Sequence, residues 1–287
     1  MAQILVENLS KTYRIHERDP GVMGAVRALV RPRYRKVQAL DGVSFSLERG
    51  ELLGFIGPNG AGKSTTIKIL TGILRPDGGR VEVDGHDPFS DRQRHVARIG
   101  VVFGQRTQLW WDLPVGDGFN LLRDLYRIDA ARFARTRDEL VALLNLERLL
   151  DQPVRQLSLG QRMRAEITAA LLHEPNILFL DEPTIGLDAP SKLAVRDFVL
   201  RANRERGTTV LLTTHDMHDI EALARRVIVI GHGRVLADCG VDALRAQVLA
   251  AQHAGDGLSG EGHGERDDMA IEAVITRFYA MHGASEA

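Results

Sequence analysis

The chain has 287 residues, of which 44% are hydrophobic and 26% are charged, so it is long enough for one large α/β domain with an appendage or for two small domains. Its formal net charge of -1 excludes the overall basic field with which many proteins bind nucleic acid, so we expect no nucleic-acid partner. A single cysteine, Cys239, excludes an internal disulfide framework and fits a reducing compartment. We interpret it as a small buried hydrophobic residue.

The first residues lack a basic segment followed by a long apolar core, so they do not predict a signal peptide. No stretch approaches the roughly 18 uninterrupted apolar residues that a membrane-spanning helix needs. We therefore expect a cytosolic chain that does not itself cross a membrane.

Two kinds of strand pattern follow one another along the chain. Polar and apolar residues alternate in three early segments, at residues 4–6, 38–47 and 80–84, which predicts an antiparallel sheet near the start. Three later segments are continuous apolar runs, at residues 176–181, 208–213 and 226–230. Such runs are typical of strands that are covered on both faces in a parallel sheet.

A basic stretch occupies residues 14–36. It carries seven basic residues and only two acidic ones, Glu17 and Asp19, and its apolar residues Val22, Met23, Val26, Leu29 and Val30 could form one face of a short helix. Each basic side chain beside an anionic lipid surface contributes about 1 kcal/mol of binding free energy, so this stretch could hold the chain against a membrane. A solvated basic loop is the alternative.

Residues 57–65 read Gly-Pro-Asn-Gly-Ala-Gly-Lys-Ser-Thr, after an apolar run and before a segment compatible with a helix. This is a phosphate-binding P-loop in its proper context, in which backbone N–H groups and a helix N-terminus face the phosphates of a nucleoside triphosphate. Lys63 would supply a positive charge to the β- and γ-phosphates, and the Ser64 hydroxyl is small enough to ligate Mg²⁺.

From residue 115 to residue 173 the apolar period is helical, which predicts a helical insert in the α/β frame. Gln105 follows a strand just before this insert, where its amide could ligate Mg²⁺ or orient water. Ser158 and the Gly160 amide would lie at a helix N-terminus suited to an anion, although an ordinary helix cap explains them equally well.

Two acidic residues, Asp181 and Glu182, end one of the buried strands. A carboxylate at this place beside a P-loop can reach the Mg²⁺ shell, and a turn at the strand end could bring Glu182 to the γ-phosphate, where it could accept a proton from water. An exposed acidic turn is the alternative. His215 ends the next strand, and taken alone it is more typical of a structural histidine.

Taken in order, these motifs resemble the nucleotide-binding subunit of ATP-binding cassette (ABC) transporters, over nearly all of residues 3 to 238. The resemblance implies a P-loop fold with a parallel-sheet core, an N-terminal antiparallel β subdomain and an α-helical subdomain. We expect a cassette at residues 1–238, containing a basic insertion at 14–36 and a helical subdomain at 105–173. Residues 239–287 would form a C-terminal extension with a helix at 241–252, a flexible glycine-rich linker and a last helix at 271–279.

The resemblance implies a role for each matching residue. Tyr13 would stack on adenine, Gln105 is the Q-loop glutamine, Asp188 belongs to the D-loop and His215 is the switch histidine. Residues implied to bind ATP are Tyr13, Gly57, Pro58, Asn59, Gly60, Ala61, Gly62, Lys63, Ser64, Thr65, Ser158, Gly160, Gln161 and Asp188. Residues implied in catalysis are Glu182, His215, Lys63 and Gln105, and those implied to hold Mg²⁺ are Ser64, Gln105 and Asp181.

One departure from the family's pattern lies in the signature loop, residues 157–161, which has Leu159 where the family has glycine. Ser158 and Gly160 remain, and the resemblance implies that they contact the ATP of an opposing subunit. We therefore expect an active site whose signature loop has altered flexibility. The basic insertion is a second departure, which makes Tyr13 a less certain adenine partner.

Residues 102–114, 153–164 and 212–217 are closer to ATPases of the ABC-2 export class, among them viologen and multidrug exporters. The resemblance implies that Trp110 and Trp111 lie where the family contacts its membrane subunit, so we expect at least one of them to be exposed. Two core tryptophans are the alternative.

We therefore predict an ATPase that powers export through a separate ABC-2-type membrane permease, as a dimer of cassettes at the cytoplasmic face of the inner membrane. Two copies of this chain, or this chain and a relative, could form the dimer. The main alternative is a soluble cassette protein that acts on ribosomes or DNA. An importer ATPase is a second alternative, disfavoured only by the closer likeness to the export class.

Overall fold

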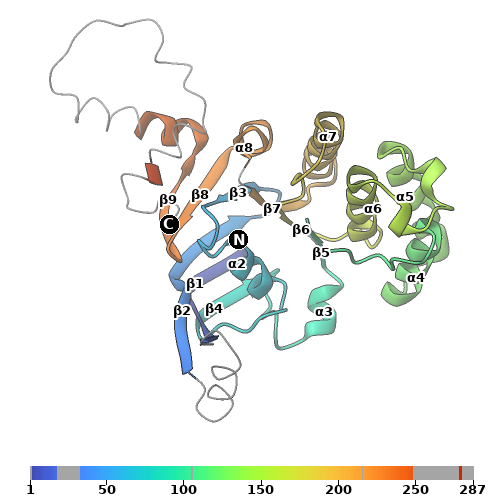
Figure 1. Ribbon diagram of the computed structural model, residues 1–287. Coiled ribbons are helices and arrows are strands. Elements are labelled where there is room, and N and C mark those ends of the chain that lie inside the picture. The colour runs from blue at the N-terminus through green and yellow to red at the C-terminus, as the bar shows by residue number, and fades with distance from the viewer. Residues whose placement is uncertain (1, 18–32, 105, 215, 248–277, 280–287) are drawn as a thin grey trace, which may run out of the picture.

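A computed structural model describes residues 2–17, 33–104, 106–214, 216–247 and 278–279 (Figure 1). Its strands are β1 (Ala2–Glu17), β2 (Arg33–Glu48), β3 (Leu52–Ile56), β4 (Gly78–Val83), β5 (Ile99–Phe103), β6 (Ile177–Asp181), β7 (Thr209–Thr214), β8 (Arg226–Gly231) and β9 (Arg234–Gly240). Its helices are α2 (Lys63–Leu70), α3 (Arg92–Val96), α4 (Val115–Tyr126), α5 (Ala130–Leu143), α6 (Leu159–Leu171), α7 (Ala189–Arg206) and α8 (Met217–Leu223), with short 3-10 helices at Glu147–Leu149 and Val154–Gln156. None of these helices is both long enough and apolar enough to span a membrane.

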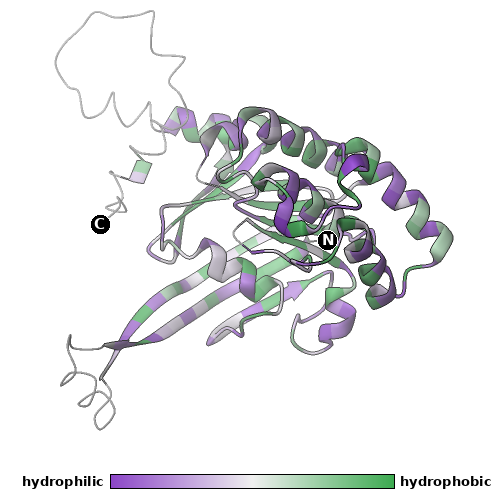
Figure 2. Ribbon diagram, turned by 45° about the vertical axis from the view of Figure 1, so that its right-hand side comes forward, coloured by the Kyte–Doolittle hydropathy of each residue, from purple (hydrophilic) through white to green (hydrophobic). Residues whose placement is uncertain are grey.

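The strands form two sheets, as the two sequence patterns predict. One has the order β2-β1-β4 and is antiparallel, while the other has the order β5-β6-β7-β3-β8-β9 and is parallel except for β9. Green and purple bands alternate along β1 and β2, as expected for strands with one buried face (Figure 2). The predicted α/β fold with an antiparallel subdomain and a helical part is confirmed.

The central sheet is covered on both faces, which explains its unbroken apolar strands. In β3, Leu53 and Phe55 pack with α2 and the antiparallel sheet, whereas Leu52 and Ile56 pack with α6, α7 and α8. This division follows from the period of two in a strand. The carboxyl ends of β3, β6 and β7 therefore meet at one edge, where a site can form.

The two ends of the basic insertion are strands. Arg14 pairs with Lys36 and Glu17 with Arg33, so β1 and β2 extend as a two-stranded ribbon beyond the sheet. On this ribbon, Tyr34 is exposed and its ring lies 4.3 Å from that of His16. The apolar residues of the predicted helix, Val22, Met23, Val26, Leu29 and Val30, lie outside the described residues.

The C-terminal predictions are described only in part. Residues 241–247 are helical, and Phe278 and Tyr279 are helical and buried in the core that contains α8, but the predicted linker lies outside the described residues. Cys239 is partly buried on β9, and burial raises the pKa of its thiol. The division of the chain at residue 238 stays a prediction.

His173, just after α6, joins the helical part to the central sheet. Its Nε2 donates to the Ile99 carbonyl of β5 at 2.9 Å, and its ring stacks on Tyr126 of α4 at 4.1 Å between centroids. Its Nδ1 is buried and has no hydrogen-bond partner among the described residues. Because protonation would place an unpaired charge there, burial lowers the pKa of His173 to about 4.

This pKa predicts a pH-dependent stability. The unfolded histidine titrates near pH 6.5, above the folded pKa of about 4, so the unfolded state binds more protons between these values. The free energy of unfolding should therefore fall by up to roughly 3 kcal/mol as the pH drops from about 6.5 to about 4. Urea unfolding at pH 7 and pH 5 should show about 2 kcal/mol of this loss in the wild type and a smaller loss in His173→Gln. Equal losses would contradict the assignment.

Candidate active site

The P-loop connects β3 to α2 through glycines that the local packing requires. A Cβ on Gly57 would lie 2.5 Å from the Ile230 carbonyl oxygen, and one on Gly62 would lie 2.7 Å from the Ala39 carbonyl oxygen. Gly62 also has a φ of 113°, which favours glycine. No side chain caps α2, so its first-turn N–H groups remain available to an anion, as a phosphate site needs.

Lys63 places its ammonium group inside this loop although its side chain is buried. Its Nζ donates to the carbonyl oxygens of Gly57 at 2.5 Å and Pro58 at 3.2 Å, and lies 4.0 Å from Glu182 Oε1. The loop thus fixes a positive charge beside a carboxylate from the end of another strand. That arrangement can bind a phosphate and hold an acidic group next to it.

Asp181 and Ser64 come together although they are far apart in the sequence. Ser64 Oγ donates to Asp181 Oδ1 at 3.2 Å, and Thr213 Oγ1 donates to the same oxygen at 2.7 Å. A hydroxyl and a carboxylate are hard oxygen ligands, so this pair fits Mg²⁺. Thr213, which the sequence did not single out, orients the carboxylate from the neighbouring strand.

Glu182 adopts a left-handed backbone conformation with a φ of 56°, which is costly for a residue other than glycine. Its N–H donates to the Thr213 carbonyl at 3.0 Å, and a Cβ on Gly104 would collide with the Glu182 carbonyl. The turn directs the side chain into the P-loop pocket rather than to the far face. The alternative of an exposed acidic turn does not describe this arrangement.

A pocket of about 600 Å³ joins these groups at the carboxyl edge of the sheet. Most of the predicted residues line it, namely Pro58, Asn59, Gly60, Ala61, Gly62, Lys63, Ser64, Thr65, Asp181 and Glu182. It is also lined by six residues that the sequence did not single out, namely Lys68, Ile73, Phe103, Gly104, Arg106 and Ile185. Helical spacing of four residues from Ser64 could have indicated Lys68, but the others depend on tertiary packing.

Three further predicted residues need separate mention. The Tyr13 hydroxyl lies 3.3 Å from Thr65 Oγ1, so β1 brings this aromatic side chain to the P-loop despite the insertion. Gln105 and His215 lie outside the described residues. Their roles stay predictions.

The signature residues form a separate cluster that does not line the pocket. Ser158 caps α6 in a capping box, accepting from the Gln161 N–H at 3.2 Å while the Gln161 side chain accepts from the Ser158 N–H at 2.8 Å. Asp188 caps α7, and its hydrogen bond with Ser191 lowers the pKa of its carboxyl. Leu159 lies over Gly186, where a Cβ would come within 2.9 Å of Leu159 Cδ2.

Gly160 packs directly against α7. In Gly160→Ala, the new Cβ would lie 2.9 Å from Ser191 Cβ and nearer still to its Oγ, so the start of α6 must shift. We expect a loss of about 1 to 3 kcal/mol in the free energy of unfolding, measured with urea. Adding Ser191→Gly removes both opposing atoms and should recover part of the loss. A single variant as stable as the wild type would contradict this packing.

Trp110 and Trp111 are 41% and 48% exposed, so the prediction that at least one is exposed is confirmed and the alternative of two core tryptophans is wrong. On α4, Leu121 and Leu125 are also exposed, whereas Phe119 and Leu122 are buried. Apolar residues therefore lie on both the buried and the exposed face of α4.

Sequence reasoning missed Glu166 of α6, which is only 3% exposed. Its carboxylate accepts hydrogen bonds from residues 107–109, just after Gln105. Burial raises the pKa of Glu166, while the hydrogen bonds from Thr107 and from the backbone of Gln108 and Leu109 oppose that rise. An isolated glutamate on an amphipathic helix gives no indication of such a contact.

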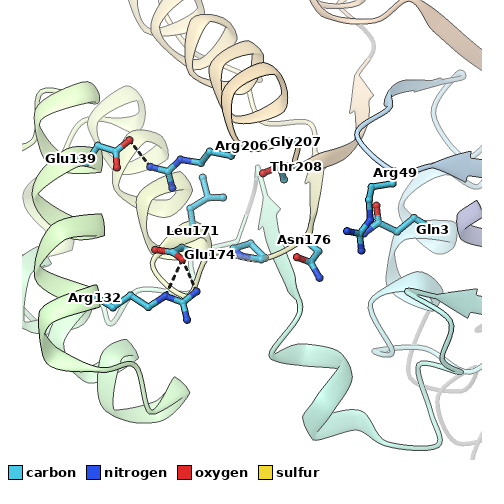
Figure 3. A pocket seen from close by; sticks show the side chains of 11 residues that line it. Gln3, Arg49, Arg132, Glu139, Leu171, Glu174, Asn176, Arg206, Gly207 and Thr208 are labelled. Carbon is cyan, nitrogen blue, oxygen red and sulfur yellow. Dashed lines mark hydrogen bonds and ion pairs between the residues drawn. The ribbon is translucent and has the colours of Figure 1, made fainter.

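A second cavity, of about 490 Å³, lies near the opposite ends of the strands, beside Asn176 and Thr208, which directly precede β6 and β7 (Figure 3). Two ion pairs line it, Arg132 with Glu174 at 2.5 Å and Arg206 with Glu139 at 2.6 Å. In each pair a glutamate of the same wall neutralises the arginine.

A P-loop beside a carboxylate pair at the carboxyl edge of a parallel sheet defines a P-loop nucleoside triphosphatase. Comparison with known proteins makes this class more specific. Residues 40–185 match the family described as ABC transporter. The chain belongs to this family and is an ATPase of the exporter type.

Among curated relatives, the chain is 41% identical to the daunorubicin resistance ATP-binding protein DrrA3 of Streptomyces coeruleorubidus, over 75% of this chain and 67% of that one. It is 36% identical to the Nod factor export ATP-binding protein I of Ralstonia nicotianae, over 72% of this chain and 64% of that one. The chain thus spans about two thirds of the length of these relatives. Among solved structures, the ADP- and Pi-bound dimer of the ATP-binding cassette MJ0796 is similar with a TM-score of 0.69 and 27% identity, over 83% of this chain and 98% of that one.

Proposed function

We propose that the chain is the ATP-hydrolysing subunit of an exporter that works through a separate ABC-2-type membrane permease. The pocket that joins Lys63, Ser64, Asp181 and Glu182 is the observation that carries the hydrolytic part of this proposal. Relatives named for daunorubicin resistance and for Nod factor export support transport of a drug-like or other compound out of the cell. The site of action would be the cytoplasmic face of the inner membrane.

In this mechanism each side chain has one task. The P-loop N–H groups and Lys63 would hold the phosphates, and Ser64 and Asp181 would hold Mg²⁺, which would supply positive charge beside the phosphates. Glu182 would accept a proton from the attacking water. By family resemblance, His215 is assigned to the γ-phosphate and Gln105 to Mg²⁺, which it would link to the joint with the permease.

The signature cluster suggests how a second cassette takes part. Ser158 is exposed at the start of α6, Gly160 is buried beside it, and neither lines the pocket of its own chain. We assign them, with Gln161 and Asp188, to the ATP of an opposing cassette. The dimeric form of the similar MJ0796 cassette supports this assignment, and a homodimer is the simplest form of it.

The exposed tryptophans and the basic ribbon would face the membrane side. We assign Trp110 and Trp111 to the joint with the permease. The exposed residues Arg14, Arg35 and Lys36 would contact anionic lipid. When all three are changed to glutamine, less of the protein should sediment with anionic vesicles. If the wild-type protein binds anionic and neutral vesicles equally well, the lipid contact is contradicted.

The test of the whole proposal is an affinity pull-down of Glu182→Gln from detergent-solubilised membranes with ATP and Mg²⁺. We expect a polytopic membrane protein that, once reconstituted, stimulates the wild-type ATPase, and weaker recovery with Trp110→Ala and Trp111→Ala. Lys63→Ala is the control for nucleotide dependence. Recovery of ribosomes or DNA-bound proteins instead would overturn the exporter proposal.

A further inference from the structure

Glu166 is a buried carboxylate that holds a loop from another part of the chain. Thr107 Oγ1 donates to its Oε1, and the backbone N–H groups of Gln108 and Leu109 donate to Oε2 at 3.0 Å and to Oε1 at 3.4 Å. Gln108 Nε2 in turn donates to the Glu166 carbonyl at 3.0 Å. The loop therefore donates hydrogen bonds to both the side chain and the backbone carbonyl of Glu166.

The same loop is attached to the signature region at a second place. The Arg162 guanidinium carbon lies 5.7 Å from the centre of the Trp111 ring, and the Arg155 N–H donates to the Trp111 carbonyl at 3.0 Å. We call residues 107–111 the tryptophan loop. These contacts attach it to α6 and to the segment that precedes α6. Ser158 begins the same helix.

The hydrogen bonds of the Glu166 carboxylate join the tryptophan loop to α6 through one side chain. Glu166 is only 3% exposed, and its carboxylate accepts hydrogen bonds from one hydroxyl and two N–H groups. Separating the loop from this carboxylate costs free energy, because the donors and the carboxylate would lose their partners where little water can replace them. The tryptophan loop and α6 should then shift together rather than separately. Isolated packing contacts would allow them to slide past each other.

We propose that Glu166 is a positioning residue that makes the tryptophan loop and the signature helix move as one unit, so that events at the exposed tryptophans reach Ser158. This rests on the proposed function, in which the loop contacts the permease and Ser158 contacts ATP across the dimer. Glu166 touches neither ligand and acts through α6. The P-loop and Asp181 lie outside this unit, so ATP binding to a single chain does not depend on it.

The chain offers a direct probe, because its only two tryptophans are Trp110 and Trp111. The variants to compare are Glu166→Gln, which places an amide N–H₂ beside backbone donors, and Thr107→Val, which removes one hydroxyl without loss of volume. Thr107→Ser keeps the hydroxyl, and Glu147→Gln changes an exposed glutamate of the helical part, so both serve as controls.

In the full chain, four quantities are measured: the Kd for ATP, kcat, acrylamide quenching of tryptophan with and without ATP, and the urea midpoint. In Glu166→Gln and Thr107→Val we expect a Kd within about twofold of wild type, a kcat at least about tenfold lower for Glu166→Gln, and loss of the ATP-dependent change in quenching. Thr107→Ser and Glu147→Gln should behave as wild type.

The proposal is overturned if both variants keep the ATP-dependent quenching change, if wild type shows no such change, or if Kd rises in parallel with the loss of kcat. A lowered urea midpoint with unchanged kcat and quenching would show a purely structural contact and overturn it as well. If Glu166→Gln does not fold, Thr107→Val against Thr107→Ser decides. A wild-type chain that binds no ATP would instead remove the proposed function.

Discussion

In the Glu182→Gln variant, we expect ATP turnover to fall by at least about a hundredfold while ATP binding persists. The left-handed backbone at Glu182 and its two hydrogen bonds to Thr213 direct the carboxylate into the pocket, 4.0 Å from Lys63. Glutamine keeps the shape of the side chain but cannot accept the proton of the attacking water. Phosphate release under saturating ATP, together with ATP binding by equilibrium dialysis, measures the two effects separately.

The matched control is Glu182→Asp, which keeps the negative charge but withdraws it by one methylene group. If the carboxylate acts as a base at one position, this variant should also be slow, because a proton acceptor must lie within hydrogen-bond reach of the water. If the charge only balances Lys63, Glu182→Asp should retain most of the activity. Wild-type turnover in Glu182→Gln would remove Glu182 from the mechanism.

For Lys63→Ala, we expect the affinity for ATP to fall by at least about tenfold and hydrolysis to fall further, since a hydrogen bond to a charged group contributes about 1.5 to 3 kcal/mol. The P-loop carbonyls of Gly57 and Pro58 hold this ammonium group in place. Isothermal titration with ATP and Mg²⁺ measures the affinity.

Lys68 provides the comparison, because it lines the same pocket from the last turn of α2. Its charge is further along the helix and not enclosed by the loop, so Lys68→Ala should weaken ATP binding much less. Equal losses in the two variants would mean that only the net charge of the pocket matters, which would contradict the specific role of Lys63.

Much of the fold and of the site could be predicted from the sequence because local patterns determine them. The P-loop needs glycines at particular steps of a strand-turn-helix unit, and Gly57 and Gly62 lie where a side chain would collide with the backbone of other elements. The apolar runs of β6 and β7 predict a doubly covered sheet, and a parallel sheet brings its carboxyl ends together. Asp181 and Glu182 could therefore be expected near the P-loop, although the direction of the Glu182 side chain depends on the turn after β6.

Other features could not be predicted because their partners are distant in the sequence. The period of α4 does not distinguish the buried Phe119 from the exposed Leu125, since both belong to one apolar pattern. The ends of the basic insertion pair as strands because β1 and β2 continue a ladder that begins in the sheet, and this ladder joins segments that are distant in the sequence.

The sequence by itself determined the class of protein and predicted its main strands and the candidate nucleotide site, because each of these depends on residue spacing within one segment. Only the tertiary structure decided that Glu166 holds the tryptophan loop, that Thr213 orients Asp181 and that burial lowers the pKa of His173. The physical reason is that hydrogen bonding and desolvation depend on which groups meet in space. A carboxylate or an imidazole has the same pattern in a sequence whether it lies in water or in the core.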